Sequence, residues 1–316
     1  MGFLPDNKAE LSSLPAQTKL IPSGCKSGFT LVELMIVVAI SGLVLIAILG
    51  VYKAQKRIMV AQDVVVDIQQ NVRTALFTLT QDIRMAGYDP TLSGNFGITF
   101  VGFRDLNDAN AVGGNSALQF TGDWNDGDGD GRPGPPNGVV DANETVTFSL
   151  YEESGAAVGT VTDLARNIGG GRQLLAQNIQ AIGLAYAYDL NNDKALDTYT
   201  TTGGTQQVIW AIDSDNDGTL DRRLDTNGDG NITNADGPGA GLNELIVGAQ
   251  ISPPVAMADI RAVRIWLLAA ESAAEHTEYY DPNTYVVGRQ IITPRDNLRR
   301  RLVETTVQCK NMGLNE

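Results

Sequence analysis

The longest apolar run of the chain lies near its N-terminus. Residues 34–51 carry no charge, and the apolar stretch reaches from residue 29 to residue 52 with Glu33 as its one charged interruption. At about 1.5 Å per residue, a helix of this length crosses the roughly 30 Å hydrocarbon core of a bilayer. It is too long for the apolar part of a secretory signal, and no small-x-small cleavage site follows it. The pattern predicts a membrane-spanning helix over residues 29–52.

A second helical pattern follows directly. Apolar side chains recur every three or four residues, at Val65, Ile68, Val72, Leu76, Leu79 and Ile83. Gly87 and the pair Asp89-Pro90 are typical of a helix end. We therefore expect one continuous helix over residues 29–86, about 87 Å long at 1.5 Å per residue. Its second half, residues 53–87, is amphipathic and needs a partner for its apolar stripe.

The remaining residues, 88–316, read mainly as strands and glycine-rich turns. Strands are expected at 97–103, 117–121, 145–151, 179–188, 207–212, 260–268, 285–292 and 301–309. In the last of these, Val303, Thr305, Val307 and Cys309 alternate with polar residues, which places Cys309 on the buried face. The pattern predicts an α+β fold, in which the long N-terminal helix packs on an antiparallel β-sheet head with acidic loop insertions.

Composition excludes several classes of function. The chain has 316 residues, 43% of them hydrophobic, and a net charge of −14, so it offers no basic field for nucleic acid. A single histidine, His276, and two cysteines, Cys25 and Cys309, exclude a zinc cluster or a disulfide framework. A Ser-His-Asp mechanism would need His276, which has no nucleophile motif near it. We do not expect an enzyme.

The negative charge is concentrated in three segments. Residues 123–144, 189–197 and 213–236 hold 16 carboxylates and four basic residues, which accounts for nearly all of the net charge. Like charges this close repel one another unless a cation lies among them. The segments are either solvated acidic loops or calcium-binding loops.

The segment 225–236 fits the twelve-residue loop of an EF-hand. Such a loop needs side-chain oxygens at positions 1, 3, 5 and 12, a carbonyl at position 7 and glycine at position 6. The chain supplies these groups with Asp225, Asn227, Asp229, Gly230, Asn231 and Asp236, and Thr233 falls at position 9. We expect a structural Ca²⁺ here rather than Mg²⁺, which demands stricter octahedral geometry.

Three further segments begin the same pattern less completely. The first has Asp213, Asp215, Asp217, the Thr219 carbonyl and Asp221, but Leu224 at position 12, so closure would need Asp225. The second has Asp126, Asp128 and Asp130 and is then interrupted by prolines 133, 135 and 136; Asp141 or Glu144 could return as a ligand. The third has Asp189, Asn191, Asp193 and Asp197, with Lys194 where glycine belongs.

The N-terminal residues resemble a known processing signal. Gly28-Phe29-Thr30-Leu31-Val32-Glu33-Leu34, followed by the apolar helix, resembles the class III signal of type IV prepilins and type II secretion pseudopilins. The resemblance implies removal of a leader, residues 1–28, by prepilin peptidase on the cytoplasmic face, and N-methylation of Phe29. It also implies an N-in orientation and pairing of Glu33 with the N-terminal ammonium of a neighbouring subunit. Cys25 would leave with the leader, so Cys309 is expected to be an inert core thiol.

Other segments point to one branch of that superfamily. Residues 71–88, 263–269 and 299–311 resemble the helix end and terminal strands of PilW-type minor pilins. The resemblance implies a minor pilin of a type IV pilus that primes assembly near the filament tip. Its partners would be other pilins and minor pilins, prepilin peptidase, the inner-membrane assembly platform and a tip adhesin. It would reside in the inner membrane as a single-pass protein before assembly, and on the pilus at the cell surface afterwards.

Two alternatives remain open at this point. One is a minor pseudopilin of the J kind from a type II secretion system, which shares the N-terminal signal. The other is a membrane-anchored, calcium-dependent adhesin that never polymerises; it would keep its leader and would not need Glu33.

Overall fold

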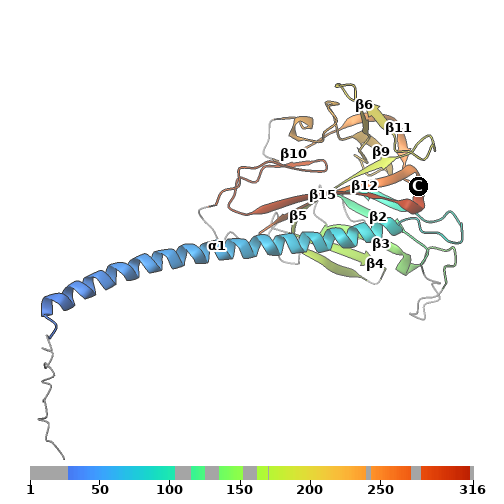
Figure 1. Ribbon diagram of the computed structural model, residues 1–316. Coiled ribbons are helices and arrows are strands. Elements are labelled where there is room, and N and C mark those ends of the chain that lie inside the picture. The colour runs from blue at the N-terminus through green and yellow to red at the C-terminus, as the bar shows by residue number, and fades with distance from the viewer. Residues whose placement is uncertain are drawn as a thin grey trace, which may run out of the picture. The chain divides into compact units, whose positions relative to one another are not determined.

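The computed structural model describes residues 28–103, 115–124, 135–151, 162–169, 171–239, 243–271 and 279–313 (Figure 1). The chain divides into two compact units, residues 1–58 and residues 59–316. The predicted leader, apart from Gly28, lies outside the described residues, as do Cys25 and His276. A single helix, α1 (Leu31–Met85), begins in the first unit and ends in the second.

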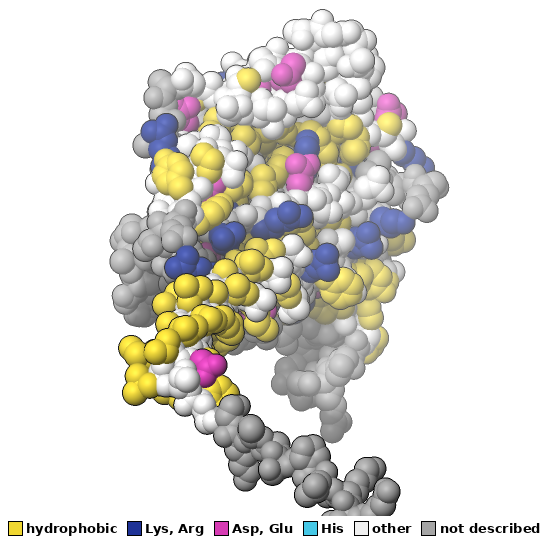
Figure 2. Space-filling view, turned by 60° about the vertical axis from the view of Figure 1, so that its left-hand side comes forward, with side chains coloured by type: hydrophobic (Ala, Val, Ile, Leu, Met, Phe, Trp, Pro, Cys, Tyr) yellow, Lys and Arg dark blue, Asp and Glu magenta, His cyan; other side chains and the backbone are white. Residues whose placement is uncertain are grey.

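The first half of α1 exposes its apolar side chains. Every large hydrophobic residue from Leu31 to Tyr52 has about half or more of its surface exposed within the chain, and these side chains cover the helix in Figure 2. Within the described part of the chain, α1 is the one helix that is long and apolar enough to cross a membrane. Apolar surface of this extent is stable in lipid or against other helices, not in water.

The second half of α1 is part of the globular unit and buries one stripe. The buried residues are Ile68, Val72, Ala75, Leu79 and Ile83, and Ala86 follows just after the helix end. The predicted stripe is confirmed at four of these positions. It was wrong at Val65, which is 38% exposed, and it omitted Ala75, which is completely buried. These residues belong to the same apolar core as the strands described next.

A ten-stranded sheet forms the centre of this unit. Its main path runs β1-β2-β3-β4-β5-β8-β9-β11, and β12 adds to it by pairing with both β5 and β15. All of its pairings are antiparallel. The strands are β1 (Ile98–Gly102), β2 (Ala117–Thr121), β3 (Thr145–Tyr151), β4 (Thr162–Ile168), β5 (Arg172–Tyr188), β8 (Ala211–Ile212), β9 (Thr219–Arg223), β11 (Ala249–Ala256), β12 (Ile260–Ala270) and β15 (Arg300–Gln308).

Smaller elements complete the described structure. Three strands form a second sheet, β10 (Asn243–Leu245), β14 (Gln290–Ile292) and β13 (Tyr285–Val287), and two form a third, β6 (Thr198–Thr200) and β7 (Gln206–Val208). Four short 3₁₀ turns are η1 (Ala142–Glu144), η2 (Asn234–Asp236), η3 (Met257–Asp259) and η4 (Lys310–Met312).

The two faces of the sheet carry two separate cores. Along β12, Ile265 and Leu267 face the core that contains α1, whereas Trp266 and Leu268 face a second core with Val287 of the small sheet. This is the alternation expected of a strand that is buried on both faces. Gly183 in β5 lets the small sheet approach, because a Cβ there would lie 2.3 Å from the backbone nitrogen of Gly288.

The α+β prediction is confirmed, with differences in individual strands. The expected strand at 207–212 is divided between β7 and β8, and the one at 285–292 is the hairpin β13–β14. Five strands were not predicted: β4, β6, β9, β10 and β11. Cys309 is completely buried as expected, and burial raises the pKa of its thiol to about 12.

Candidate functional site

The start of α1 carries the predicted processing site and a helix cap. Gly28 and Phe29 are exposed, and nothing lies within 4 Å of the position that a Cβ on Gly28 would take. The Glu33 carboxylate accepts hydrogen bonds from the Thr30 N–H (3.0 Å) and hydroxyl (3.1 Å), and the Thr30 hydroxyl accepts from the Glu33 N–H (3.2 Å). This reciprocal arrangement is a capping box. Glu33 therefore satisfies donors of its own helix while its side chain stays open to a further cation.

Three of the four candidate calcium loops, those that begin with Asp189, Asp213 and Asp225 at position 1, share one backbone conformation. The residues at position 4 (Asn192, Asn216 and Gly228) and at position 6 (Lys194, Gly218 and Gly230) all have left-handed φ, between 55° and 93°. The aspartate at position 1 is buried in each loop, at Asp189, Asp213 and Asp225. The sequence pattern therefore specifies a common loop, even where lysine replaces glycine.

The hydrogen bonds inside these loops also repeat. In each one, the carboxylate at position 1 accepts the N–H of position 6, at 2.9 Å from Lys194, 2.8 Å from Gly218 and 2.7 Å from Gly230. The side-chain oxygen at position 3 accepts the N–H of position 5, and that at position 5 accepts the N–H of position 7. Such bonds turn the side-chain oxygens toward the inside of the loop, which is the arrangement that a hard cation needs.

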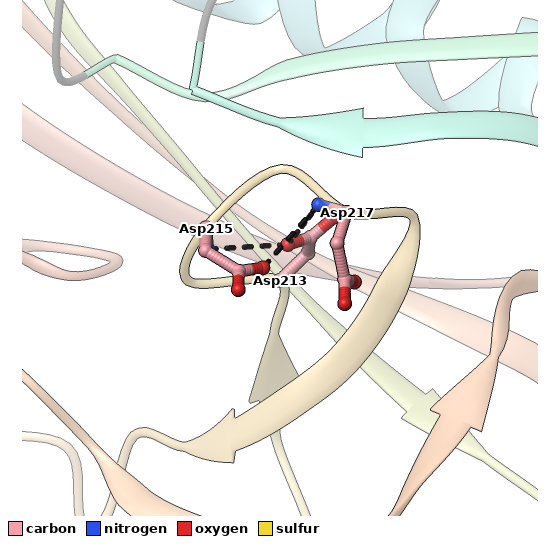
Figure 3. Close-up of side chains that lie close together, drawn as sticks. All are labelled: Asp213, Asp215 and Asp217. Atoms are coloured by element: carbon pink, nitrogen blue, oxygen red, sulfur yellow. Dashed lines mark hydrogen bonds between the residues drawn. The ribbon is translucent and has the colours of Figure 1, made fainter.

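The loop after β8 brings three carboxylates closest together. Oxygens of Asp213, Asp215 and Asp217 lie within 4.8 Å of one another, the one such group of three acidic side chains among the described residues (Figure 3). Burial raises the pKa of Asp213, although backbone N–H groups of the loop oppose the shift. Asp221 takes no part in this group: its carboxylate accepts the N–H and the hydroxyl of Ser214, both at 2.7 Å. The Thr219 N–H and hydroxyl both donate to Asp217.

The loop 225–236 is organised differently at its end. Asp225 binds the N–H groups of Gly228 and Gly230, and the Tyr199 hydroxyl donates to its carboxylate. Asp236, at position 12, accepts from the N–H groups of Thr226 and Thr233, and Thr233 is the N-cap of η2. In this structure the Asp236 carboxylate caps backbone groups and does not join the oxygens of Asp225 and Asp229 in a group of three.

The remaining acidic segment is described only at its two ends. Asp126, Asp128 and Asp130 lie outside the described residues. Beside them Asp123, which is completely buried, accepts the N–H groups of Asn137 (3.0 Å) and Gly138 (2.9 Å). Glu144 accepts the N–H of Trp124 (2.9 Å) and of Asp141 (2.9 Å).

Sequence reasoning missed two residues that hold these loops in place. Tyr199 in β6 binds Asp225, and the centre of its ring lies 4.0 Å from the guanidinium carbon of Arg223. Asn216 accepts the N–H of Phe103 at 3.2 Å, which ties the loop after β8 to the end of β1. Neither contact has a local sequence signal, because its partners are 26 and 113 residues apart.

Comparison with protein families identifies the chain. A model of the prokaryotic N-terminal methylation motif matches residues 24–49, and the model of type IV pilus-assembly protein W matches residues 140–311, more than half of the chain. The chain belongs to the pilus-assembly protein W family. The first match covers the capped start of α1, and the second runs from the 3₁₀ turn before β3 to η4, so it includes β12 and β15.

Comparison with individual proteins adds little to this family assignment. No curated protein matches the chain. Among solved structures, a type IV-like pilin from Thermus thermophilus matches at 13% identity, covering 78% of this chain and 97% of that one, with a TM-score of 0.34. At that score the likeness supports no argument about this chain.

Proposed function

We propose that this member of the pilus-assembly protein W family is a minor pilin that primes assembly near the tip of a type IV pilus. The observation that carries the proposal is a 55-residue helix whose first half exposes nearly all of its apolar side chains and begins in a methylation motif. A helix of this kind is stable in a bilayer, and a filament built from similar helices offers it an equivalent apolar environment.

Processing would begin at the exposed start of the helix. Prepilin peptidase would cut between Gly28 and Phe29 on the cytoplasmic side, and the new N-terminus of Phe29 would be methylated. The chain would then lie in the inner membrane with its N-terminus inside, and would reach the cell surface within the pilus. Its partners would be pilins, other minor pilins, the inner-membrane assembly platform and a tip adhesin.

Glu33 would guide the docking step. A carboxylate within the membrane is costly unless it is paired, and the N-terminal ammonium of a neighbouring subunit would supply the opposite charge. In the structure its hydrogen-bond partner is Thr30, three residues away. Because that contact is local and exposed, it leaves room for an intermolecular ion pair.

A mutational test separates docking from helix capping. Glu33→Ala removes the charge and the cap together, whereas Thr30→Val removes the hydroxyl and leaves the charge. If Glu33 docks the subunit, recovery of the chain in sheared pili falls for Glu33→Ala and stays near the wild-type level for Thr30→Val. Equal loss in both variants, or normal incorporation of Glu33→Ala, contradicts the docking role. Mass spectrometry of the mature N-terminus, expected to read methyl-Phe29, checks processing independently.

Genetic deletion separates the type IV pilus from the type II secretion alternative. A strain that lacks the chain should lose surface pili and twitching while it continues to secrete exoproteins. The reverse phenotype favours a minor pseudopilin of the J kind. An intact leader on the mature protein, with unchanged function of Glu33→Ala, favours a membrane-anchored adhesin that does not polymerise.

We also propose that the acidic loops bind Ca²⁺ and that the ion stabilises the head. Support comes from the shared loop conformation and from the three gathered carboxylates of Asp213, Asp215 and Asp217. Calcium is plentiful outside the cytoplasm, where this part of the chain would fold. A ligand that binds only the folded state stabilises it by mass action.

A further inference from the structure

Three strands form the borders of the ten-stranded sheet, and two of them are protected. Each of β1, β11 and β15 has a single partner strand. β1 is five residues long and is interrupted by a register shift between Ile98 and Phe100. β11 shifts register between Gln250 and Val255 and contains Pro253 and Pro254, which have no N–H to offer. Short strands, bulges and prolines are the usual means of keeping an edge from pairing with another chain.

β15 lacks all of these protections. It pairs with β12 over nine residues without a register shift and contains neither proline nor glycine. Its central residues, Val303, Thr305, Thr306 and Val307, are β-branched and favour an extended backbone. Its first residue is fixed by two ion pairs: the buried Arg300 guanidinium contacts Asp296, which is partly exposed, at 2.6 Å and the buried Asp281 at 3.3 Å. The strand is thus long, regular and held in place before any partner arrives.

The backbone groups that face outward from β15 can be identified from the ladder. The Cys309 N–H donates to the Arg261 carbonyl, and the Glu271 N–H donates to the Arg299 carbonyl. In an antiparallel pair such residues alternate along the strand. The odd-numbered residues of β15 therefore bond to β12, and Leu302, Glu304, Thr306 and Gln308 point their N–H and C=O groups away from the sheet.

These outward groups are open within the part of the chain that the structure describes. No hydrogen bond from a described residue reaches the backbone of Leu302, Glu304, Thr306 or Gln308. A row of unpaired groups along nine residues is a template for one more strand. Main-chain bonds of this kind supply the affinity when an extended peptide adds to a sheet edge.

We propose that the β15 edge binds an extended segment of another protein as an additional strand of the sheet. The charge along the edge indicates what that segment carries. Arg301 is exposed, whereas Glu304 already forms an ion pair with Arg264 at 2.5 Å and accepts the Trp266 N–H at 2.9 Å. A segment with a carboxylate opposite Arg301 therefore fits, because opposite charges across a strand pair are favourable. A second copy of this chain, with its net charge of −14, is repelled as a whole.

The test uses the full-length chain in detergent and two synthetic probes. The first is a nine-residue peptide of alternating valine and threonine with glutamate at both ends, and the second has lysine at both ends. We expect the glutamate peptide to slow amide hydrogen exchange of Leu302, Glu304 and Gln308 by about tenfold or more, because strand pairing protects amides. The lysine peptide should bind about threefold more weakly, and Arg301→Glu should reverse that preference.

A proline variant tests whether the backbone edge is the binding element. Thr306→Pro removes an outward N–H and keeps the ladder to β12, since proline is tolerated where the N–H faces solvent. It should abolish the slower exchange, whereas Thr306→Ala should keep it. If Thr306→Pro destabilises the fold, Gln308→Pro against Gln308→Ala provides the same comparison at the end of the strand.

Three results would overturn the proposal. The first is that the peptide slows amide exchange equally in the proline and alanine variants. The second is that neither peptide slows exchange. The third is that light scattering shows dimerisation of the chain through β15. Because the probes are peptides, these outcomes do not depend on whether the chain acts in a pilus or in a secretion system.

Discussion

Carboxylates in the head accept hydrogen bonds from N–H and hydroxyl groups, and the pKa of Asp89 shows how strongly these bonds favour the ionised form. Partial burial raises its pKa, but the Gly94 N–H (2.7 Å) and the hydroxyls of Thr91 (2.8 Å) and Ser93 (3.1 Å) outweigh burial and lower the pKa to about 2. The pKa of an unfolded aspartate is about 3.9, so the ionised form is favoured in the folded state. The resulting stability is present above about pH 4 and is lost as the pH falls toward 2.

This predicts a pH-dependent effect of one substitution. Asp89→Asn should lower the melting temperature at pH 7, and the difference from wild type should shrink below about pH 4 and disappear near pH 2. Asp63→Asn, at an exposed position on α1, is the matched control and should change little at any pH. Thermal unfolding followed by circular dichroism at several pH values measures this. Parallel curves for wild type and Asp89→Asn would show that Asp89 is not ionised preferentially in the folded head.

The thiol of Cys309 gives a second prediction for a single residue. It is completely buried, and its pKa of about 12 leaves almost no thiolate at neutral pH. In the mature chain it should stay unmodified by iodoacetamide at pH 8 and react only after unfolding in urea. Mass spectrometry of the labelled protein decides the question. Rapid labelling of the folded chain contradicts the core assignment.

At the scale of elements, the second half of α1 has side chains buried in the core and side chains that are exposed. Leu79 is completely buried in the core beneath the sheet, whereas Phe77, two residues earlier, is 63% exposed. Leu79→Ala should destabilise the head by about 2–5 kcal/mol, since it removes core contacts and leaves a cavity. Phe77→Ala should change the free energy of unfolding by no more than about 0.5 kcal/mol. Urea titration of the full-length chain in detergent compares the two, and a larger loss for Phe77→Ala contradicts this packing.

The sequence predicted the helix and the main strands because their patterns are local. The stripe from Ile68 to Ile83 follows the helical period, but Ala75 was omitted because a small side chain carries little hydrophobic signal, although it is completely buried. β4 reads Thr-Asp-Leu-Ala-Arg-Asn-Ile, which alternates poorly, and it forms because β3 and β5 pair with it on both sides. β11 contains two prolines, which argue against a strand except at an edge.

The conformation of the candidate metal loops was predictable in their first half, whereas metal binding stays a prediction. Positions 1 to 7 follow from the spacing of aspartate, asparagine and glycine, and even Lys194 adopts the left-handed φ of 69° that glycine would take. In the loops 213–221 and 225–236, the last carboxylate binds donors of its own loop. Asp236 accepts the N–H groups of Thr226 and of Thr233, the N-cap of η2, and Asp221 accepts the N–H of Ser214. Twelve-residue spacing alone does not encode this choice.

At the scale of the whole molecule, charge and apolar surface are kept in separate parts of the chain. The exposed apolar residues from Leu31 to Tyr52 belong to one compact unit, and nearly all of the net negative charge belongs to loops of the other. The apolar helix and the acidic head are stable in different surroundings. A helix in lipid needs no counterion, whereas loops with this density of carboxylates gain from a divalent cation.

Calcium should therefore change the stability of the head. At a calcium concentration about 100 times the dissociation constant, a single site adds about 2.7 kcal/mol to the free energy of unfolding, which corresponds to several degrees in melting temperature. Asp213→Asn should remove most of this gain, because Asp213 is the buried member of the three gathered carboxylates. Asp221→Asn lies in the same loop but outside that group, so it should keep the gain.

Melting of the full-length chain in calcium, in magnesium and in chelator measures each case. Unchanged melting of the wild-type chain on adding calcium rules out a stabilising site, and a gain lost only in Asp225→Asn moves the site to the loop 225–236.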